Sequence, residues 1–467
     1  MRNLDAIIKA YDVRGTYPDQ LDEELAHQVG AAFVRVVGAA AHAGGPGAVV
    51  VAHDMRPSGP SLVESFAQGV REQGCDVVLI GLASTDGLYF ASGRLDLPGA
   101  MFTASHNPAQ YNGIKLCRPG AAPVGQDSGL REIRRMIDEG VPAFDGPLGE
   151  VREQDMLTEY AQFLRELVDV SAIRRLRVVV DAGNGMGGFT VPAVLGDGAG
   201  LPALPLDIDA LYFELDGSFP NHEANPIDAE NMRDLQARVR ETGADLGLAF
   251  DGDADRCFVV DERGEIVDPS TLTALIASRE LAKYPGSSII HNLITSKAVP
   301  EVVLENGGTP VRTRVGHSFI KQTMAETGAV FGGEHSGHFY FRDFWRADSG
   351  MLAALHTVAA LGETEEGTRL SSLLAPFDRY VSSGEINTEV ADQSAVTEAI
   401  RAEFLSRGVT DIEDFDGMTV TGHGWWFNVR PSNTEPLLRL NVEAGDAQQM
   451  ASIRDEVLAM MRSGGSA

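Results

Sequence analysis

The chain alternates short apolar segments with amphipathic segments, and this alternation restricts it to folds in which helices cover β-sheets. Residues 49–51 form an apolar run of strand length, and residues 62–70 then place apolar side chains at helical spacing. The same rhythm returns in residues 178–250 and again in residues 289–331. We therefore expect three similar α/β domains in succession, each built on a mixed sheet.

Each of these domains ends in an unusual polar loop directly after its last predicted strand. The three loops read TASHNP (103–108), DGDADR (251–256) and GGEHSGH (332–338), after predicted strands at 100–103, 246–250 and 329–331. In open α/β sheets, ligands bind beyond the carboxyl ends of the strands. We therefore expect the three loops to meet at one central cleft.

The chain changes character after about residue 377. GEINTEV and WWFNVR are typical of strands, and residues 395–404 and 446–461 are typical of helices. These segments predict a smaller α+β domain, with the loop RPSNTEP between two of its strands. The expected limits of the four domains are 1–150, 151–260, 261–374 and 375–467.

Length, charge and cysteine content narrow the class of protein. The 467 residues are too many for one core, and the formal net charge of -29 disfavours nucleic acid and anionic membranes as partners. The three scattered cysteines, with no basic-then-apolar N-terminus and no apolar run of membrane length, predict a cytoplasmic protein without disulfides. The sequence leaves the oligomeric state open between monomer and dimer.

The loop DGDADR places three carboxylates at alternate positions, at Asp251, Asp253 and Asp255. Such a spacing is either a solvated acidic turn or a site for a hard divalent cation, Mg²⁺ or Ca²⁺, which relieves the repulsion among the carboxylates. An EF-hand is excluded, because Arg256 stands where that loop needs glycine and the flanking sequences predict strands. Arg256 is therefore expected to balance charge or to contact an anion.

The loop RPSNTEP is rich in donors for a phosphate. It offers Arg430, Ser432, Asn433 and Thr434 within five residues, and Arg439 follows on the next predicted strand. Guanidinium, hydroxyl, amide and backbone N–H groups are the usual phosphate ligands. A simple hairpin turn explains the same residues equally well.

Three further segments carry weaker signals. Glu334 and Ser336 suit adjacent sugar hydroxyls, and His317 begins a predicted helix, where a neutral imidazole either moves a proton or caps the helix. Near the N-terminus, KAYDVRG presents Tyr11 and Arg14, which fit either an anion contact or a surface turn.

Taken together, the motifs indicate a protein family far more specifically than any one of them does. KAYDVRG, TASHNP with YNGIK, DGSFPNHEANP, DGDADR, GEHSGH and RPSNTEP follow one another over nearly the whole chain. This order resembles the α-D-phosphohexomutase superfamily, in its phosphomannomutase/phosphoglucomutase branch. The resemblance implies four domains around one cleft, with a signature loop from each. Ala52-His53 departs from the Gly-Arg that relatives often show there, which puts a minor contact in doubt.

The resemblance implies that Ser105 carries a phosphoryl group. The mechanism that the resemblance implies is a two-step exchange: the phosphoserine gives this group to a hexose monophosphate, a hexose 1,6-bisphosphate forms and turns around, and its other phosphoryl group returns to Ser105. One Mg²⁺ per chain would be held by the three aspartates and the phosphoserine oxygen. The Asn112-Gly113 pair is expected to form a tight turn that brings Lys115 back towards Ser105.

The resemblance also assigns the remaining site residues. Lys115 and His317 are the candidates for proton transfer, with the roles of acid and base left open, and Arg14 joins them as a catalytic candidate. The substrate site is expected to include Tyr11, Arg256, Glu334, His335, Ser336, Gly337, His338, Arg430, Ser432, Asn433, Thr434 and Arg439.

Three other functions stay open on the sequence. A phosphoglucosamine mutase would share most of these motifs, although KAYDVRG favours the mannose and glucose branch. A Mg²⁺-dependent sugar-phosphate phosphatase would use an aspartate as nucleophile, and a non-enzymatic sugar-phosphate or Ca²⁺ binding module would not need Ser105. The sequence does not distinguish mannose from glucose.

Overall fold

The computed structural model describes residues 3–40, 47–432 and 437–463, without the side chains of residues 317, 318 and 463. The chain divides into two compact units. The larger unit comprises Met1–Pro269 and Lys321–Leu373, and the smaller unit comprises Ser270–Ile320 and Leu374–Ala467.

The first sheet is mixed, with the strand order β1-β5-β4-β2-β3-β7 and β6 beside β5. Strands β2, β3, β4 and β7 run parallel, and β1 and β5 pair antiparallel. The strands are β1 (Val13–Thr16), β2 (Ala48–His53), β3 (Asp76–Leu82), β4 (Gly99–Phe102), β5 (Tyr111–Arg118), β6 (Ala122–Pro123) and β7 (Val151–Glu153).

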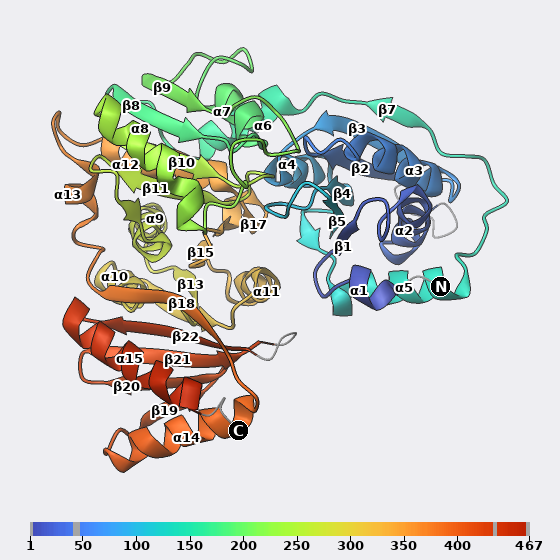
Figure 1. The fold of residues 1–467 in the computed structure, drawn as a ribbon. Helices are drawn as coiled ribbons and strands as arrows, with labels where there is room; N and C mark the ends of the chain where they lie inside the picture. Colours follow the sequence, from blue (N-terminus) through green and yellow to red (C-terminus); the bar gives the residue numbers. More distant parts are fainter. Residues whose placement is uncertain (1–2, 41–46, 433–436, 464–467) are drawn as a thin grey trace. The chain divides into compact units, whose positions relative to one another are not determined.

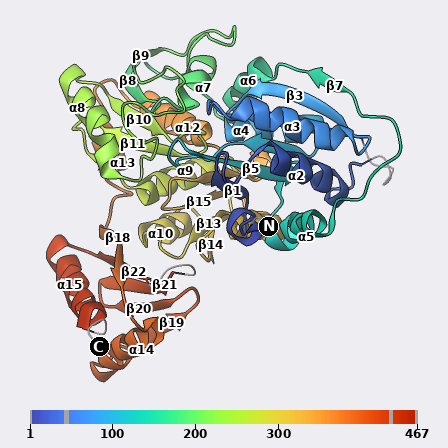
Figure 2. The same cartoon turned by 45° about the vertical axis from the view of Figure 1, so that its right-hand side comes forward.

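Helices cover both faces of this sheet. Val49 and Val51 on β2 belong to a core shared with α2 (Glu23–Val36), α3 (Gly59–Arg71) and α5 (Arg131–Glu139), and Figures 1 and 2 show α2 and α3 side by side. Because side chains alternate along a strand, the buried Val50 faces the other side. There α4 (Thr85–Leu95) packs against β2 and β4. Burial on both faces explains why residues 48–52 of β2 are all apolar.

The second sheet is also mixed, with the order β12-β11-β10-β8-β9. Its strands are β8 (Leu176–Asp181), β9 (Leu206–Leu211), β10 (Leu246–Phe250), β11 (Cys257–Asp261) and β12 (Ile266–Val267). Strand β8 pairs parallel with β9 and β10, whereas β10, β11 and β12 pair antiparallel. Helix α8 (Arg233–Thr242) packs on one face, through Leu235 and Val239. The DGDADR loop therefore joins two strands, which confirms that it is not an EF-hand.

The third α/β region contributes to both units. In the larger unit, β15 (Phe331–Gly333), β16 (Phe339–Phe341) and β17 (Ala347–Asp348) pair antiparallel and are followed by α12 (Gly350–Gly362). In the smaller unit, β13 (Ser288–Asn292) and β14 (Thr309–Thr313) pair parallel, with α10 (Ala298–Glu305) between them in sequence. Helices α9 (Pro269–Lys283) and α11 (His317–Thr327) flank these strands in sequence.

The last sheet is antiparallel throughout, with the order β18-β22-β21-β20-β19. Its strands are β18 (Val381–Glu389), β19 (Asp411–Asp414), β20 (Met418–Gly422), β21 (Trp425–Pro431) and β22 (Leu437–Ala444). Helices α14 (Gln393–Ser406) and α15 (Ala447–Ser463) share one core with this sheet. Three regions with mixed pairing, followed by an antiparallel α+β domain, confirm the predicted fold class.

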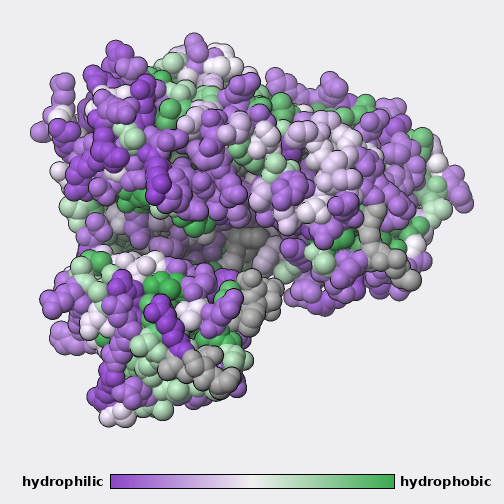
Figure 3. Space-filling view, viewed as in Figure 1, coloured by the Kyte–Doolittle hydropathy of each residue, from purple (hydrophilic) through white to green (hydrophobic). Residues whose placement is uncertain are grey.

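The hydrophilic surface and the unpaired cysteines are those expected from the amino-acid composition. Hydrophilic residues dominate the face shown in Figure 3, as expected for a chain with 67 acidic and 38 basic side chains. The three cysteines Cys75, Cys117 and Cys257 are buried free thiols. Among the described helices, none combines the length and the apolar character that crossing a membrane requires.

Within the larger unit, the buried carboxylate of Asp86 joins the three α/β regions. Its Oδ2 accepts hydrogen bonds from Tyr160 on α6 (Leu157–Leu167) at 2.8 Å and from Ser349 at 2.6 Å, and its Oδ1 accepts one from Ser84. Ser84 and Ser349 are also the N-caps of α4 and α12. Burial raises the pKa of Asp86 to about 6, although the three hydroxyl donors oppose this shift.

We predict that Asp86→Asn changes how stability depends on pH. Because the folded-state pKa lies above the ordinary value, the contribution of Asp86 is complete only below that ordinary value and is lost as the pH rises through about 6. Relative to Asp86→Asn, the wild type should gain about 1 kcal/mol between pH 7.5 and pH 5. Melting of both proteins at both pH values, with the exposed Asp197→Asn as control, measures this. A difference that does not change with pH would contradict the prediction.

Candidate active site

Three buried aspartates stand in the loop between β10 and β11. One oxygen from each of Asp251, Asp253 and Asp255 lies within 4.8 Å of the others. We call these residues the aspartate triplet. Gly252 allows another loop to approach, because a Cβ atom there would lie 2.4 Å from the carbonyl oxygen of Ser105. The triplet is therefore packed directly against the loop that follows β4.

Ser105 in that loop points at the triplet. Its backbone adopts a left-handed conformation with φ of 49°. Its Oγ donates a hydrogen bond to Asp251 Oδ2 at 2.8 Å and lies 3.1 Å from His106 Nδ1. Ser105 is 3% exposed. The structure thus brings together the two groups that the sequence analysis placed at one centre.

The expectation of a tight turn at Asn112-Gly113 is wrong. Both residues lie inside β5, and the chain reverses earlier, between Ser105 and Tyr111. The glycine serves close packing instead, because a Cβ atom at Gly113 would lie 2.6 Å from the carbonyl oxygen of Val13 on β1. Strand β5 nevertheless carries Lys115 to the site, as expected.

Lys115 forms ion pairs with the triplet. Its Nζ lies 2.7 Å from Asp253 Oδ2 and 2.6 Å from Asp255 Oδ2. Burial lowers the pKa of Lys115, but the two carboxylates outweigh burial and hold that pKa well above its ordinary value. In this arrangement the ammonium group partly neutralises the triplet.

Arg256 connects the triplet with the GEHSGH loop. Its backbone N–H donates to Asp251 Oδ1 at 3.1 Å, and its Nε lies 3.2 Å from His338 Nε2. His338 Nε2 is also 3.6 Å from Asp255 Oδ1. The predicted sugar-binding loop and the aspartate triplet are therefore neighbours within the larger unit.

The other residues of this loop contact both near and distant parts of the chain. Buried Glu334 accepts a hydrogen bond from Tyr340 at 2.7 Å, and Ser336 Oγ lies 3.0 Å from His338 Nδ1. His335 Nδ1 lies 3.6 Å from Asp268. Gly337 has φ of 83°, and a Cβ atom there would lie 2.5 Å from the Phe258 ring. The turn that presents Ser336 therefore requires glycine at position 337.

Arg14 on β1 contacts the Ser105 loop within the first domain. Its Nη1 donates to Asn107 Oδ1 at 2.5 Å and to the carbonyl oxygen of Ala104 at 3.4 Å, and its Nη2 pairs with Asp12. Tyr11 is 40% exposed. Arg14 therefore lies beside the Ser105 loop, and its role in the site stays a prediction.

The predicted phosphate-binding residues lie in the smaller unit. Arg430 at the end of β21 contacts Glu385 at 3.0 Å, and Arg439, its partner on β22, lies 3.8 Å from the same carboxylate. The backbone N–H of Ser432 donates to the carbonyl oxygen of Leu437 at 2.8 Å. The predicted ligands Asn433 and Thr434 lie outside the described residues, as does the side chain of His317 at the start of α11.

Several residues at the site were not predicted. Thr85 binds Asp253 through both its backbone N–H, at 3.0 Å, and its hydroxyl, at 2.6 Å. Asp348 offers an oxygen close to Asp255 and His338. Lys321 pairs with Asp348 at 2.6 Å. These contacts join distant segments, so no local pattern in the sequence indicates them.

His106 was also not predicted as a site residue, although it follows Ser105. Its Nδ1 lies 3.1 Å from Arg256 Nη2. Burial lowers the pKa of His106 to about 3, with further lowering by Arg256 and Arg14. The imidazole is therefore neutral beside Ser105.

The carboxylate oxygens of the aspartate triplet are suitable ligands for a hard divalent cation. Asp253 Oδ1 and Asp255 Oδ1 are buried and have no hydrogen-bond partner among the described residues. An unpaired buried carboxylate oxygen is costly, and carboxylate oxygens are the ligands that Mg²⁺ takes in proteins. The residues present therefore suit Mg²⁺ at this position.

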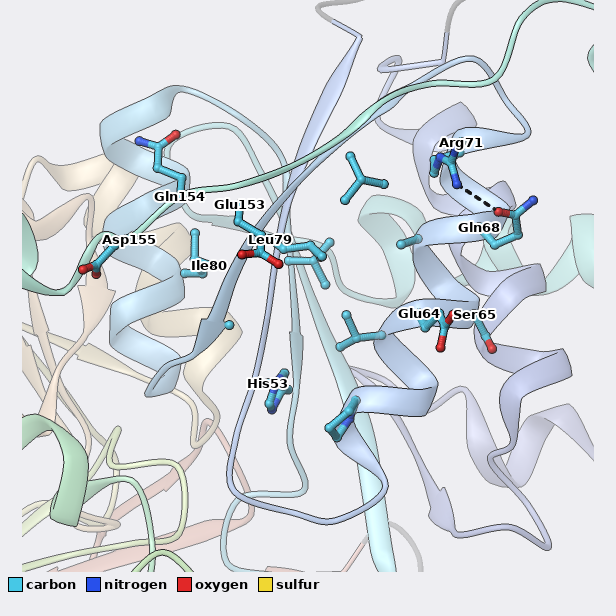
Figure 4. A pocket seen from close by; sticks show the side chains of 16 residues that line it. His53, Glu64, Ser65, Gln68, Arg71, Leu79, Ile80, Glu153, Gln154 and Asp155 are labelled. Atoms are coloured by element: carbon cyan, nitrogen blue, oxygen red, sulfur yellow. Dashed lines mark hydrogen bonds between the residues drawn. The ribbon is translucent and has the colours of Figure 1, made fainter.

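A large cavity elsewhere in the larger unit is separate from this site. It has a volume of about 960 Å³ and is lined by α3, β2, β3 and residues 151–155 (Figure 4). His53, one of the departures from the family pattern, faces it from the end of β2. Neither Ser105 nor the triplet lines this cavity. The size of this cavity therefore does not indicate the position of Ser105 and the aspartate triplet.

Four family models match the chain in succession. They are described as phosphoglucomutase/phosphomannomutase alpha/beta/alpha domain I (residues 5–142), domain II (158–264), domain III (268–380) and C-terminal domain (385–460).

Similar proteins match over almost their whole length. Proteins named phosphohexose mutases, from Xanthomonas campestris pv. campestris, are 40% identical over 457 residues, covering 97% of this chain and 98% of the relative. A phosphomannomutase of Salmonella montevideo is 37% identical over 470 residues, covering 99% of this chain and all of the relative.

A solved structure agrees with these matches. The crystal structure of a phosphoglucomutase/phosphomannomutase family protein from Burkholderia thailandensis has a TM-score of 0.87 and 32% identity, covering 100% of this chain and 99% of that one. The predicted superfamily is confirmed, and a purely non-enzymatic binding module is excluded. The chain belongs to the phosphoglucomutase/phosphomannomutase family of the α-D-phosphohexomutase superfamily, and it is a hexose-phosphate mutase, an isomerase of carbohydrate metabolism.

Proposed function

We propose that this mutase interconverts hexose 6-phosphate and hexose 1-phosphate through a phosphoserine at Ser105. The observation that carries the proposal is the 2.8 Å contact between Ser105 Oγ and Asp251 Oδ2, inside a buried cluster of carboxylates and cations. The phosphoryl group leaves Ser105 Oγ for the free hydroxyl of a hexose monophosphate, whose proton passes to a base of the protein. The resulting hexose 1,6-bisphosphate turns around and returns its other phosphoryl group to Ser105.

The aspartate triplet and a phosphoserine oxygen would hold one Mg²⁺ in this proposal. When bound, Mg²⁺ neutralises negative charge on the phosphoryl group during transfer. Lys115 and Arg256 place two fixed positive charges beside the triplet, Lys115 at Asp253 and Arg256 at Asp251. These residues orient the phosphoserine and concentrate positive potential around it, although the net charge of the chain is -29.

Burial protects the proposed phosphoserine from water. Ser105 is 3% exposed, and Asp251 and Asp253 are fully buried. Exclusion of water limits hydrolysis of the phosphoryl group, which would otherwise leave the enzyme dephosphorylated until a bisphosphate restored it. Low exposure of Ser105 is consistent with a mutase, in which a sugar hydroxyl and not water accepts the phosphoryl group.

The remaining residues suit the sugar and its second phosphate. Glu334 and Ser336 would bind hydroxyls in both orientations of the bisphosphate. Arg430, Ser432, Asn433, Thr434 and Arg439 would bind the phosphate that does not react, and the common cleft that this requires stays a prediction. Lys115 and His317 remain the candidates for proton transfer, with the roles of acid and base open.

The names of relatives bear on the preferred sugar. The Salmonella montevideo relative is named a phosphomannomutase, and a Pseudomonas putida relative, 36% identical, is named a phosphomannomutase/phosphoglucomutase. We therefore propose mannose and glucose phosphates as substrates, with glucosamine phosphate as the alternative. A coupled assay comparing the three sugar 1-phosphates decides between them.

The phosphoserine is tested by intact mass. Incubation with glucose 1,6-bisphosphate should add one phosphoryl group to the wild type and none to Ser105→Ala, because that variant lacks the acceptor oxygen. The exposed Ser171→Ala serves as a matched control and should behave as the wild type does. Uptake of a phosphoryl group by Ser105→Ala, or none by the wild type, would remove the mechanism.

The metal assignment is tested by calorimetric titration with Mg²⁺. Asp253→Asn should weaken Mg²⁺ binding by at least about ten-fold, because it replaces a buried anionic ligand by a neutral amide. Turnover should fall with it, while circular dichroism shows a retained fold. Unchanged Mg²⁺ affinity in this variant, or normal turnover in the presence of a chelator, would show that the cation binds elsewhere.

Arg430 is tested by steady-state kinetics. Arg430→Ala should raise KM by about ten-fold or more with a small change in kcat, because a contact to the unreactive phosphate serves the ground state and the transition state alike. The half-buried Arg454→Ala, also in the smaller unit, controls for the loss of one positive charge. A defect confined to kcat would contradict the assigned role.

A further inference from the structure

The buried side chain of Arg56 has no role in the mechanism above, yet all its terminal donors serve the Ser105 loop. Nη1 donates to the carbonyl oxygens of Pro108 at 3.0 Å and Tyr111 at 2.9 Å. Nη2 donates to the carbonyl oxygens of Ser105 at 2.9 Å and Asn107 at 2.6 Å. The side chain is 0% exposed. One guanidinium group thus fixes four points of a single loop.

The conformation of Ser105 explains why such fixing matters. A left-handed backbone costs a residue with a side chain about 1 kcal/mol or more, so its surroundings must hold it in place. The carbonyl oxygen of Ser105 is bonded to Arg56, and its N–H donates to Thr103 Oγ1 at 2.9 Å. These two bonds fix both peptide groups of Ser105 and so aim its Oγ at Asp251.

The chemistry of the guanidinium group suits this task better than an ammonium group would. Arginine presents five N–H donors in one rigid plane, whereas lysine presents three donors on a flexible stem. Asp54, also fully buried, keeps the guanidinium charge paired, with its Oδ2 at 3.3 Å from Nε. Asp54 Oδ1 accepts the backbone N–H of Arg56 at 2.9 Å, which fixes the start of the side chain.

A segment of the second α/β region covers this arginine. The ring of Phe219 lies over the guanidinium group, with its centroid 5.2 Å from Cζ. A Cβ atom at Gly217 would lie 2.8 Å from Arg56 Cα, so the two backbones are in close contact there. Both residues belong to DGSFPNHEANP (216–226), a motif without a role in the proposed function. The contact gives this motif a role behind the phosphoserine loop.

We propose that Arg56, covered by Phe219, is a positioning residue that sets the geometry of Ser105 for phosphoryl transfer. It touches neither substrate nor metal and acts through the backbone of residues 105–111. The inference rests on the proposed phosphoserine mechanism. It assigns Arg56 to the rate of transfer and not to the affinity for the sugar.

The test compares Arg56→Lys with Arg71→Lys, a matched change on α3 in the same domain, where Arg71 bonds the carbonyl oxygen of Gly149. Each protein is treated with glucose 1,6-bisphosphate, and intact mass gives the fraction that carries a phosphoryl group. Turnover is then measured with whichever of mannose 1-phosphate and glucose 1-phosphate the wild type converts, and kcat is expressed per phosphorylated molecule.

We expect kcat per phosphorylated molecule to fall at least about ten-fold in Arg56→Lys, because small errors in the position of a reacting atom are costly. KM should stay within about three-fold of the wild type, since the sugar contacts are retained. Arg71→Lys should match the wild type in both constants. A merely structural role would lower the melting temperature or the active fraction but leave kcat per phosphorylated molecule unchanged.

A second variant keeps the test decisive if Arg56→Lys does not fold. Phe219→Leu retains the arginine but removes the ring above it, and should lower kcat per phosphorylated molecule in the same direction by about three-fold. Phe213→Leu, in the same region, is its control. Unchanged kcat in the folded variants, or a rise in KM alone, would overturn the inference and leave the phosphoserine mechanism standing. A wild type that takes up no phosphoryl group would overturn both.

Discussion

The repulsion among three buried carboxylates is the constraint on which the site depends. Burial, together with Asp255 and Asp253, holds the pKa of Asp251 well above its ordinary value. The raised pKa means that Asp251 holds its proton more readily than an ordinary carboxyl group. When all three aspartates are ionised, Lys115 and Arg256 supply only two positive charges against three negative ones, and two carboxylate oxygens still lack hydrogen-bond partners among the described residues. A phosphoryl group on Ser105 would add further negative charge. A bound cation, as proposed here, would therefore offset the excess negative charge of the site.

The fold keeps this unfavourable cluster in place by bracing it from several elements. Thr85 binds Asp253 from the start of α4, and the next residue, Asp86, ties the same helix to Tyr160 and Ser349. Arg56 holds the Ser105 loop from behind. The charged groups thus sit on strand ends and helix starts that have little freedom to relax, which is what an arrangement ready for phosphoryl transfer requires.

Much of the fold and the centre of the site follow from sequence pattern. Strand-length apolar runs followed by helical spacing predict the mixed sheets, and loops at strand ends predict that Ser105 and the triplet meet. The prediction of a turn at Asn112-Gly113 is wrong. Turn propensity depends on local sequence, whereas the close approach of Val13 to Gly113 is a tertiary contact. Thr85, Arg56 and Asp348 were missed for the same reason, since each acts on a partner more than 40 residues away in sequence. Single sequences carry no record of such pairs.

The coupling between the phosphoryl group and the cation is the most direct test of the account. Mn²⁺ serves as a stand-in for Mg²⁺ whose binding to the wild type can be followed by electron paramagnetic resonance, before and after Ser105 is phosphorylated. The account predicts that the phosphorylated form binds Mn²⁺ at least about ten-fold more tightly, because an anionic oxygen joins the three carboxylates. Equal affinity in the two forms would show that Ser105 and the aspartate triplet do not share one cation.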